Sequence, residues 1–560
     1  MKKLILILFS FLIFQASFAT ELYHAISSYQ ADISALSRKY SNPYSEEYFK
    51  RFDKLYTDWL KALEAMPYES YSMDGKLDYQ IFRNYLEKQQ YFHQAAYVEF
   101  REVSNVVDFG SPLEDFYQKR RAALKPKAQE LAATFGQVEL LAKSKWEQMK
   151  NAKPYASWQQ AELASSVVES LRRSTEEAYR FYFDYDPEFT WWMKKPMESL
   201  NETLKGYSDF LKNHFENTVV KDDGSGIIGK PIGKTNIEKE LLYNMIPYTA
   251  EELIKEGEKQ YAWCEAEMIK ASEELGFGKE WRKALEHVKN QYVPAGVWPG
   301  MVVEMADEAI AFVEVRDLLT IPDMAKETWR TTMMSAERQK VSPFFLGGET
   351  ILISYPTSEM SHEDKMMSMR GNNPHFSRAV VHHELIPGHH LQQFMNQRHF
   401  PHRRMFNTPF WVEGWTLYWE FNLWDKDFPR NVEDKVGMLF WRMHRAARIV
   451  FSLKYHLGEW TPQQCIDFLV DNVGHERANA EAEVRRSFEG SYGPLYQLAY
   501  MIGGIQVYQL RQEMVEGGKM TEKEFHDYFI TQNYMPIELL RARMNEELPE
   551  NFKTSWKFLD

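Results

Sequence analysis

The sequence predicts a mainly helical protein with one short β element. Over most of the chain, apolar residues recur at intervals of three and four, which is the spacing of amphipathic helices. Aromatic residues make up 15% and hydrophobic residues 44% of the chain, which suffices for a large packed core and excludes a disordered chain. The pattern changes at 350–355, a run of β-forming residues between Gly347-Gly348 and Pro356. We expect a strand there, with a buried apolar loop as the alternative.

The first residues have the features of a secretory signal. Two lysines precede an apolar run that ends at Phe14 and is shorter than the roughly 20 residues that span a bilayer. Small side chains at Ser17 and Ala19 suit cleavage after Ala19, so residues 1–19 are the expected signal peptide. We expect an exported protein, periplasmic or secreted. No cysteine follows the cleavage site, so we expect no lipid anchor and no membrane contact after cleavage.

A loop rich in glycine and proline at 221–236 separates two predicted lobes. Residues 20–220 form an N-terminal helical lobe without a catalytic pattern, and residues 237–560 form the lobe that carries the chemistry. The net charge of −13 argues against nucleic acid or an anionic membrane as a partner. The two cysteines, Cys264 and Cys465, lie in unrelated segments, and we expect them to be buried free thiols.

Capping signals place several helices of the second lobe. Thr249 with Glu252 forms a capping box that opens a helix running to about residue 275. Asn373-Pro374 begins the histidine-rich helix, and Thr408-Pro409 begins the next one. A long amphipathic helix over 436–457 ends at Gly458 and is expected to lie in the core.

Histidines concentrate in the helix that follows Asn373. Four of the 16 lie between His382 and His390, with Glu384 among them. Neutral imidazole is a common zinc ligand, so this clustering predicts a metal site. The alternative is a histidine-rich surface helix that ends at the Pro387-Gly388 pair.

The spacing of these histidines differs from the zinc-hydrolase signature His-Glu-x-x-His, because the residue four after His383 is Pro387. His389, six residues on, lies about 240° around an ideal helix. The two imidazoles reach one metal only if the helix is distorted between them. Pro387 and Gly388 supply this distortion, which we interpret as a two-residue bulge.

The third expected ligand is Glu413, on the helix that begins at Thr408. Glu413 and Glu420 are seven residues apart and share a helical face among many aromatic side chains. A carboxylate in such surroundings is costly unless it is paired or bound to a metal. We expect Glu420 to accept a hydrogen bond from a ligating imidazole. The alternative is an exposed pair of glutamates on a surface helix.

His383-Glu384-Leu385-Ile386-Pro387-Gly388-His389 resembles the signature His-Glu-x-x-Pro-Gly-His of the bacterial domain-of-unknown-function-885 family. The resemblance extends to Glu413, Gly414, Trp415, Tyr418, Glu420, Pro494, Tyr500, Gly503 and Arg511. The family is similar in outline to helical zinc peptidases of the thimet-oligopeptidase and thermostable-carboxypeptidase kind. The resemblance therefore implies an all-α body with two lobes around a central cleft. This chain departs from the family pattern after Pro494, where Leu495 to Gln497 replace Gly-Gln-Ala.

These observations predict a zinc metallopeptidase that binds one zinc ion per chain through His383, His389 and Glu413. Two imidazoles and one carboxylate leave an open position on a tetrahedral zinc. We expect Glu384 to be the general base and Tyr500 to hydrogen-bond the developing oxyanion.

Short peptides are the expected substrates, cleaved in the manner of a carboxypeptidase or an oligopeptidase. Tyr418 and His390 are expected near the site, where they would support a ligand or contact the substrate, with His390 close to the cleft but not ligating the metal. Arg511, 11 residues after Tyr500, is expected on the same helical face as a binder of the peptide's C-terminal carboxylate. Arg486 is the second candidate for that role.

Three other functions fit the same residues. A zinc hydrolase of non-peptide amides or esters needs the same centre. Two histidines and one carboxylate also describe non-haem iron oxygenases, from which metal analysis distinguishes a zinc enzyme. A non-enzymatic periplasmic binding protein with a structural metal is the last alternative, and it leaves Glu384 without a task.

Overall fold

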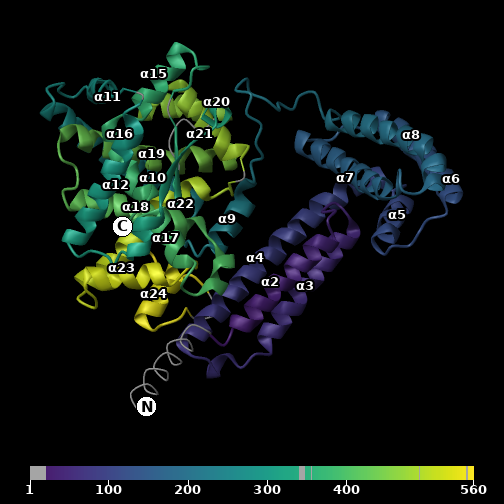
Figure 1. Ribbon diagram of the computed structural model, residues 1–560, viewed down its shortest axis with the longest axis horizontal. Coiled ribbons are helices and arrows are strands. Elements are labelled where there is room, and N and C mark those ends of the chain that lie inside the picture. The colour runs from purple at the N-terminus through teal and green to yellow at the C-terminus, as the bar shows by residue number, and fades with distance from the viewer. Residues whose placement is uncertain are drawn as a thin grey trace. The chain divides into compact units, whose positions relative to one another are not determined.

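The computed structural model describes residues 20–294, 296–339, 347–354, 356–490, 492–549 and 553–559. The predicted signal peptide, residues 1–19, lies outside the described residues. The described chain is mainly helical with one small sheet, which confirms the predicted fold class (Figure 1). Among the described helices, none combines the length and the apolar character needed to cross a bilayer.

The chain divides into two compact units, each described by itself below. The smaller unit comprises Ser27–Met66 and Tyr85–Lys221. The larger unit comprises Pro67–Asn84, Asp222–Asp560 and the described residues up to Ile26. The division at Asp222 falls inside the predicted joining loop. Two short segments that we expected in the N-terminal lobe, at its start and around residue 75, belong instead to the larger unit.

The smaller unit is a set of helices packed around its own apolar core. Helices α5, α6 and α8 pack against one another or against α7, and the buried side chains between them include Phe135, Leu171 and Leu204. Its elements are α3 (Glu46–Glu64), η3 (Ser104–Val107), α5 (Ser111–Arg121), α6 (Ala128–Lys150), α7 (Trp158–Tyr182) and α8 (Pro187–Lys212), with α2 (Tyr23–Lys39) and α4 (Met73–Val103) shared between the units.

The larger unit contains the segments with chemical content. The predicted caps are confirmed: Thr249 and Glu252 form the capping box of α10, Asn373 caps α16 and Thr408 caps α18. Its helices are η2 (Tyr68–Ser70), α9 (Gly233–Tyr243), α10 (Ala250–Glu274), α11 (Trp281–Lys289), α12 (Trp298–Val315), α13 (Asp323–Thr328), α14 (Ala336–Gln339), α15 (His362–Gly371), α16 (Pro374–Glu384), α17 (His389–Asn396), η4 (Pro401–Phe406), α18 (Pro409–Asp425), α19 (Val432–His456), α20 (Pro462–Phe468), η5 (Leu469–Val473), α21 (Arg477–Phe488), α22 (Tyr496–Arg511), η6 (Gln512–Glu516), α23 (Glu522–Thr531) and α24 (Ile537–Asn545).

The small sheet has two parallel strands. β1 (Arg330–Met333) pairs with β2 (Thr350–Ile353), and Arg330 lies opposite Thr350. The predicted strand is thus confirmed as far as Ile353; Tyr355 lies outside the described residues. Strand β2 points Ile351 and Ile353 into the core of the larger unit.

Four helices, α16, α18, α19 and α22, pack together at the centre of the larger unit (Figure 1). Glycines set how closely two of them approach. A Cβ added at Gly414 of α18 would lie 2.7 Å from the backbone of Gly503 in α22. Side chains at these two positions would push the helices apart, so glycine at both is a packing requirement.

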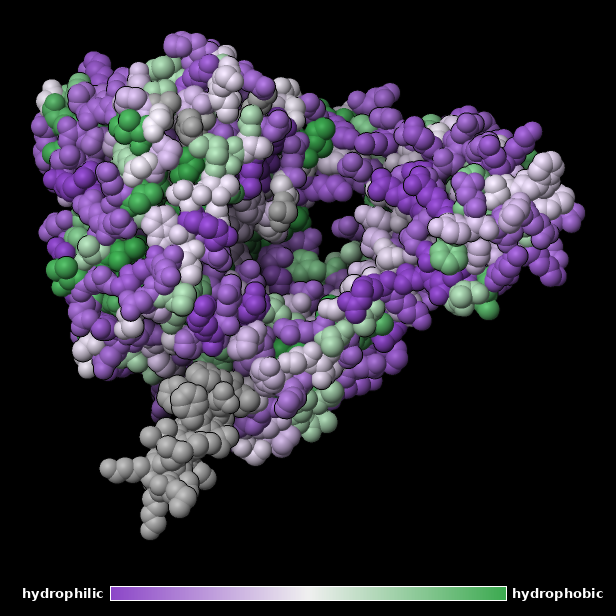
Figure 2. Space-filling model, viewed as in Figure 1, coloured by the Kyte–Doolittle hydropathy of each residue, from purple (hydrophilic) through white to green (hydrophobic). Residues whose placement is uncertain are grey.

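The surface and the cysteines agree with the composition. Most of the face seen in Figure 2 is hydrophilic, as a mean hydropathy of −0.52 and 26% charged residues lead one to expect. Cys264 and Cys465 are both buried and free, which confirms the expectation. Burial raises the pKa of the Cys264 thiol to about 12, so it is inert towards exchange at neutral pH.

Candidate metal centre

The histidine-rich segment forms two helices separated by a sharp break. Helix α16 ends at Glu384 and α17 begins at His389, so the expected bulge within one helix is a full interruption. The Gly388 N–H donates to the carbonyl of His382 at 3.0 Å. A Cβ at Gly388 would collide with the carbonyl oxygen of His383, so only glycine allows the chain to fold back this tightly.

This break brings three side chains together. His383 and His389 present their imidazoles at 83° to each other with ring centroids 5.0 Å apart. Glu413 of α18 completes the group, with Oε2 at 3.3 Å from His389 Nε2 and 3.5 Å from His383 Nε2. One ligand atom from each residue lies within 4.8 Å of the others, as required of three ligands to one ion.

The donor set fits a zinc ion. Ligand atoms bonded to a tetrahedral zinc at about 2.1 Å lie about 3.4 Å apart, which matches the two distances to Glu413. The buried Oε2 of Glu413 has no hydrogen-bond partner among the described residues, although a carboxylate oxygen without one is costly. Burial opposes the charge of Glu413, yet the two imidazoles hold its pKa well below the usual value. Glu413 is therefore negatively charged at neutral pH, as a carboxylate ligand has to be.

Glu420 lies about two helical turns after Glu413 and contacts the opposite edge of the His383 ring. The His383 Nδ1–H donates to Glu420 Oε1 at 2.7 Å, and both side chains are buried. Arg445 of α19 lies 3.5 Å from the same oxygen. Burial disfavours an imidazolium, but the carboxylates of Glu413 and Glu420 outweigh it and raise the pKa of His383 to about 9.

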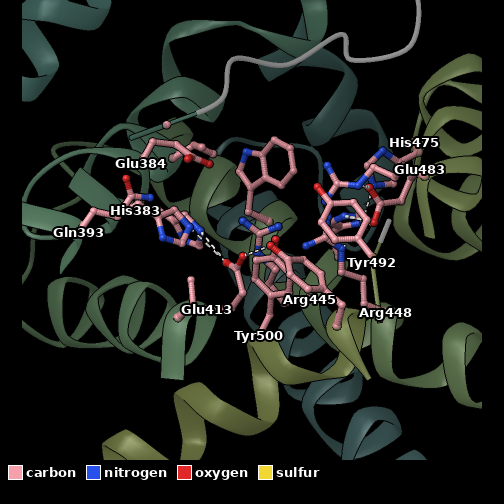
Figure 3. A pocket seen from close by; sticks show the side chains of 18 residues that line it. His383, Glu384, Gln393, Glu413, Arg445, Arg448, His475, Glu483, Tyr492 and Tyr500 are labelled. Carbon is pink, nitrogen blue, oxygen red and sulfur yellow. Dashed lines mark hydrogen bonds and ion pairs between the residues drawn. The ribbon is translucent and has the colours of Figure 1, made fainter. Parts of the chain in front are cut away.

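The three candidate ligands lie in the wall of a pocket of about 260 Å³ (Figure 3). Its remaining lining residues are Gly347, Val380, Glu384, Gln393, Val412, Trp441, His444, Arg445, Arg448, His475, Glu483, Arg486, Tyr492, Tyr496 and Tyr500. Glu384, the expected base, is at this wall, and Gly347 packs so closely against it that a Cβ there would collide with the carboxylate. The base is thus held beside the candidate ligands.

Two tyrosines of α22 reach the centre. Tyr500, the expected oxyanion donor, lies nearly parallel to His383 with ring centroids 6.0 Å apart. Burial raises its pKa, so the phenol keeps its proton at neutral pH. Tyr496, which we did not single out, donates its hydroxyl hydrogen to Glu413 Oε1. Helical spacing places Tyr496 and Tyr500 on one face of α22, but the sequence alone does not tell which of them contacts Glu413.

Three residues expected near the substrate lie elsewhere. The hydroxyl of Tyr418 contacts His526 Nε2 at 2.6 Å in the core, because five residues after Glu413 the helix has turned to its opposite face. His390 donates from Nε2 to the Ala325 carbonyl. Arg511 pairs with Glu516 and Glu522 outside the pocket lining. These placements correct the roles proposed from the sequence.

His382 points away from the centre. Its ring is buried against Phe428 with centroids 5.6 Å apart. Burial lowers the pKa of His382 to about 3, so it remains neutral at physiological pH. Of the adjacent pair, His383 therefore lies beside Glu413 and His382 does not.

Sequence reasoning missed part of the pocket wall. Arg445 and Arg448 lie on α19, which we assigned to the core, and Arg448 Nε donates to Glu483 Oε1 at 2.7 Å. His444 and His475 contact each other beside this pair, with His475 Nε2 at 2.9 Å from His444 Nδ1. The available signal was the presence of arginines on an apolar helix face, since a buried charge requires a partner.

The comparisons with known proteins agree with this fold. A solved structure described as "a putative lipoprotein of unknown function from Shewanella oneidensis" is 16% identical, with a TM-score of 0.67 over 94% of this chain and 100% of that one. A second, "the putative lipoprotein from Colwellia psychrerythraea", is 16% identical with a TM-score of 0.60 over 94% of this chain and 97% of that one. No curated protein matches the chain. The family model described as "Bacterial protein of unknown function (DUF885)" matches residues 29–544, and the chain therefore belongs to this family.

Proposed function

We propose that this protein is an exported, zinc-dependent hydrolase of short peptides that binds one divalent ion per chain. The observation that carries the proposal is the convergence of His383, His389 and Glu413 at tetrahedral-edge distances, with Glu384 in the same pocket wall. A structural metal has no need of a neighbouring carboxylate and an adjoining cavity. A catalytic centre needs both.

A bound zinc ion would lower the pKa of a water molecule and polarise the scissile carbonyl. Glu384 would accept a proton from the attacking water and return it to the leaving amine. Tyr500 keeps its phenolic hydrogen and would donate it in a hydrogen bond to the developing oxyanion. Tyr496 orients Glu413 through its hydroxyl.

The size and lining of the pocket support short peptides as substrates. A cavity of about 260 Å³ accommodates a few residues of an extended chain and excludes a folded domain. Its wall combines Trp441, Val380 and Val412 with charged and tyrosine side chains, so apolar and polar parts of a peptide both find contacts. Ester or non-peptide amide substrates would use the same centre.

The predicted signal at residues 1–19 supports export. The two structural neighbours are described as lipoproteins, which also supports an exported protein but differs from our expectation of a chain without lipid. The first cysteine of this chain is Cys264, which is buried. The intact mass of the mature protein purified from membrane and soluble fractions decides between the lipid-bearing and lipid-free forms.

The test of the proposed function is elemental analysis together with cleavage of a peptide library by the purified mature protein. We expect about one zinc per chain and cleavage that a chelator abolishes and zinc restores. Loss of cleavage with retained zinc in Glu384→Gln would support the assigned roles. Iron in place of zinc, or zinc without cleavage of any peptide, would contradict the proposal.

A further inference from the structure

The pocket has a second chemical feature besides the candidate metal centre, namely three arginines in its wall. We refer to Arg445, Arg448 and Arg486 as the arginine cluster. Figure 3 shows His383 and Glu384 on one side of the pocket and Arg448 with Glu483 on the opposite side. The pocket therefore runs from a base and metal ligands to guanidinium groups.

The carboxylates around the cluster do not balance it. Arg445 pairs with Glu420, which is itself occupied by His383. Among the described residues, the other two arginines form ion pairs with Glu483: Arg448 Nε lies 2.7 Å from Oε1, and Arg486 Nε lies 3.1 Å from Oε2. Two guanidinium groups thus share one carboxylate, so the three arginines outnumber by one the described carboxylates that pair with them directly.

The histidines nearby neither add to this charge nor neutralise it. His444 lies 3.7 Å from Glu483 and His475 contacts His444. Burial lowers the pKa of His475 to about 3 and that of His444 well below its usual value. Both rings are therefore neutral at physiological pH. The excess charge belongs to the arginines.

The arginines also have unused donors. Within the described residues, the buried Nη1 of Arg448 and Nε of Arg445 have no hydrogen-bond partner. A guanidinium has five N–H donors in a planar fork, and leaving them unpaired in a buried site is costly. Both groups stack against the ring of Tyr500, at 4.4 Å for Arg448 and 4.8 Å for Arg445, which holds them in place. They are rigid, charged and incompletely satisfied.

We infer that the arginine cluster is a subsite for a carboxylate of the substrate. A planar guanidinium matches a carboxylate with two parallel hydrogen bonds, and the excess positive charge favours an anion. The inference rests on the proposed function for the identity of the substrate, a peptide, whose C-terminal carboxylate is the source common to every sequence. Cleavage at the metal centre would then release a fragment from the C-terminus. Arg486 thereby takes the role that we had given first to Arg511.

Binding to the inactive Glu384→Gln protein tests the inference without turnover. The probes are acetyl-Ala-Phe-Ala with a free C-terminus, the same peptide as its C-terminal amide, and acetyl-Ala-Glu-Ala amide. Calorimetry gives the Kd of each for the zinc-loaded protein. We expect the free acid to bind about tenfold or more tightly than its amide, the size of a charge-assisted hydrogen bond. Tight binding of the glutamate peptide instead would assign the carboxylate to a side chain.

Two further comparisons separate the arginines from the metal. A carboxylate could bind zinc directly, so the measurement is repeated on protein freed of metal, where the preference for the acid should persist. In Arg486→Gln, a residue whose side chain is 29% exposed, the preference should fall to less than twofold with an unchanged Tm. The matched control is Arg485→Gln, whose exposed neighbouring guanidinium contacts Gly226 and Glu489 and should keep the full preference. Arg448→Gln provides a second cluster variant if Arg486→Gln unfolds.

Equal Kd values for acid and amide would overturn the inference, as would a preference that disappears with the metal or survives in both cluster variants. These results are distinct from a failure of the proposed function. If the protein prefers carboxylates but cleaves no peptide, the subsite is supported and the proposed hydrolase activity is contradicted. If the protein cleaves free and amidated peptides equally, the hydrolase activity is supported and the carboxylate subsite is contradicted.

Discussion

The Nδ1 of His383 lies 2.7 Å from Oε1 of Glu420, and this contact determines which nitrogen of the imidazole faces Glu413. A carboxylate only accepts, so Nδ1 carries the hydrogen and Nε2 is the nitrogen left for a metal. The same contact fixes the plane of the ring. Glu420 would therefore influence a bound ion without touching it.

Replacing Glu420 with glutamine should weaken zinc binding while leaving Glu413 in place. The amide is a poorer acceptor for Nδ1–H, and such outer partners typically contribute about 10- to 100-fold in metal affinity. Competition with a chromophoric chelator measures the effect. Glu481→Gln, an exposed change on α21, is the control and should bind zinc as the wild type does. Equal affinities of Glu420→Gln and the control would show that the contact does not orient the ligand.

Glu384→Gln should abolish peptide cleavage and leave zinc content and Tm nearly unchanged. Glu384 lines the pocket but does not belong to the group of atoms that could hold the ion. Removing a general base typically lowers the rate by about 10²- to 10⁴-fold. The measurements are the rate of cleavage of a fluorescence-quenched peptide and the zinc content by elemental analysis. Zinc lost together with activity would mean that Glu384 is a ligand.

Gly388→Ala should cost both stability and metal. The added methyl group would collide with the carbonyl of His383, so the break between α16 and α17 must open. Overpacking of this kind costs about 1–3 kcal/mol in the free energy of unfolding, and we expect zinc affinity to fall about tenfold or more because His389 is displaced. Gly300→Ala, in the first turn of α12 with no atom near its added Cβ, is the control and should leave zinc affinity unchanged without lowering stability. Unchanged zinc affinity in Gly388→Ala would show that the break between α16 and α17 does not determine the geometry of the metal site.

Asp434 should contribute to stability in a defined pH window. Burial alone would raise its pKa, but His375 Nδ1 at 2.7 Å and Arg430 Nε at 3.0 Å lower it from 3.8 to about 2. A lowered pKa stabilises the fold above the unfolded value, near pH 4, and this stabilisation disappears as the pH falls towards 2. The shift corresponds to about 2 kcal/mol.

The measurement for Asp434 is the difference in unfolding free energy between the wild type and Asp434→Asn as a function of pH. We expect a constant difference from pH 5 to pH 8 that shrinks between pH 4 and pH 2. Asp307→Asn, an exposed change on α12, should show no such dependence. A difference that grows on acidification would have the wrong sign for this ion pair.

The sequence was informative where the cause is local. The caps at Thr249, Asn373 and Thr408 depend on a few neighbouring residues, and all three form as predicted. The shared face of Glu413 and Glu420 follows from helical geometry alone, and the structure turns both towards His383. Strand β1, by contrast, is exposed along its length and shows no alternation, so only its distant partner reveals it.

The sequence was misleading where position along a helix or a distant partner decides. Arg511 shares a helical face with Tyr500, but 11 residues correspond to about 16 Å along the axis, which takes the guanidinium past the pocket. Arg448 looked like part of an apolar helix because Glu483, its partner, is 35 residues away. A periodic pattern gives the face of the helix on which a side chain lies, but neither its position along the helix relative to the pocket nor its partner.

The contact between Gly414 and Gly503 has a mechanical consequence for the metal. Because their backbones touch, α18 and α22 fix the position of Glu413 relative to Tyr496 and Tyr500. The two histidines lie on α16 and α17, one on each side of the break at Pro387-Gly388. An ion bound by these three residues would link the α18–α22 pair to the chain on both sides of that break. The affinity for that ion would then depend on how closely the break holds the two histidines to α18.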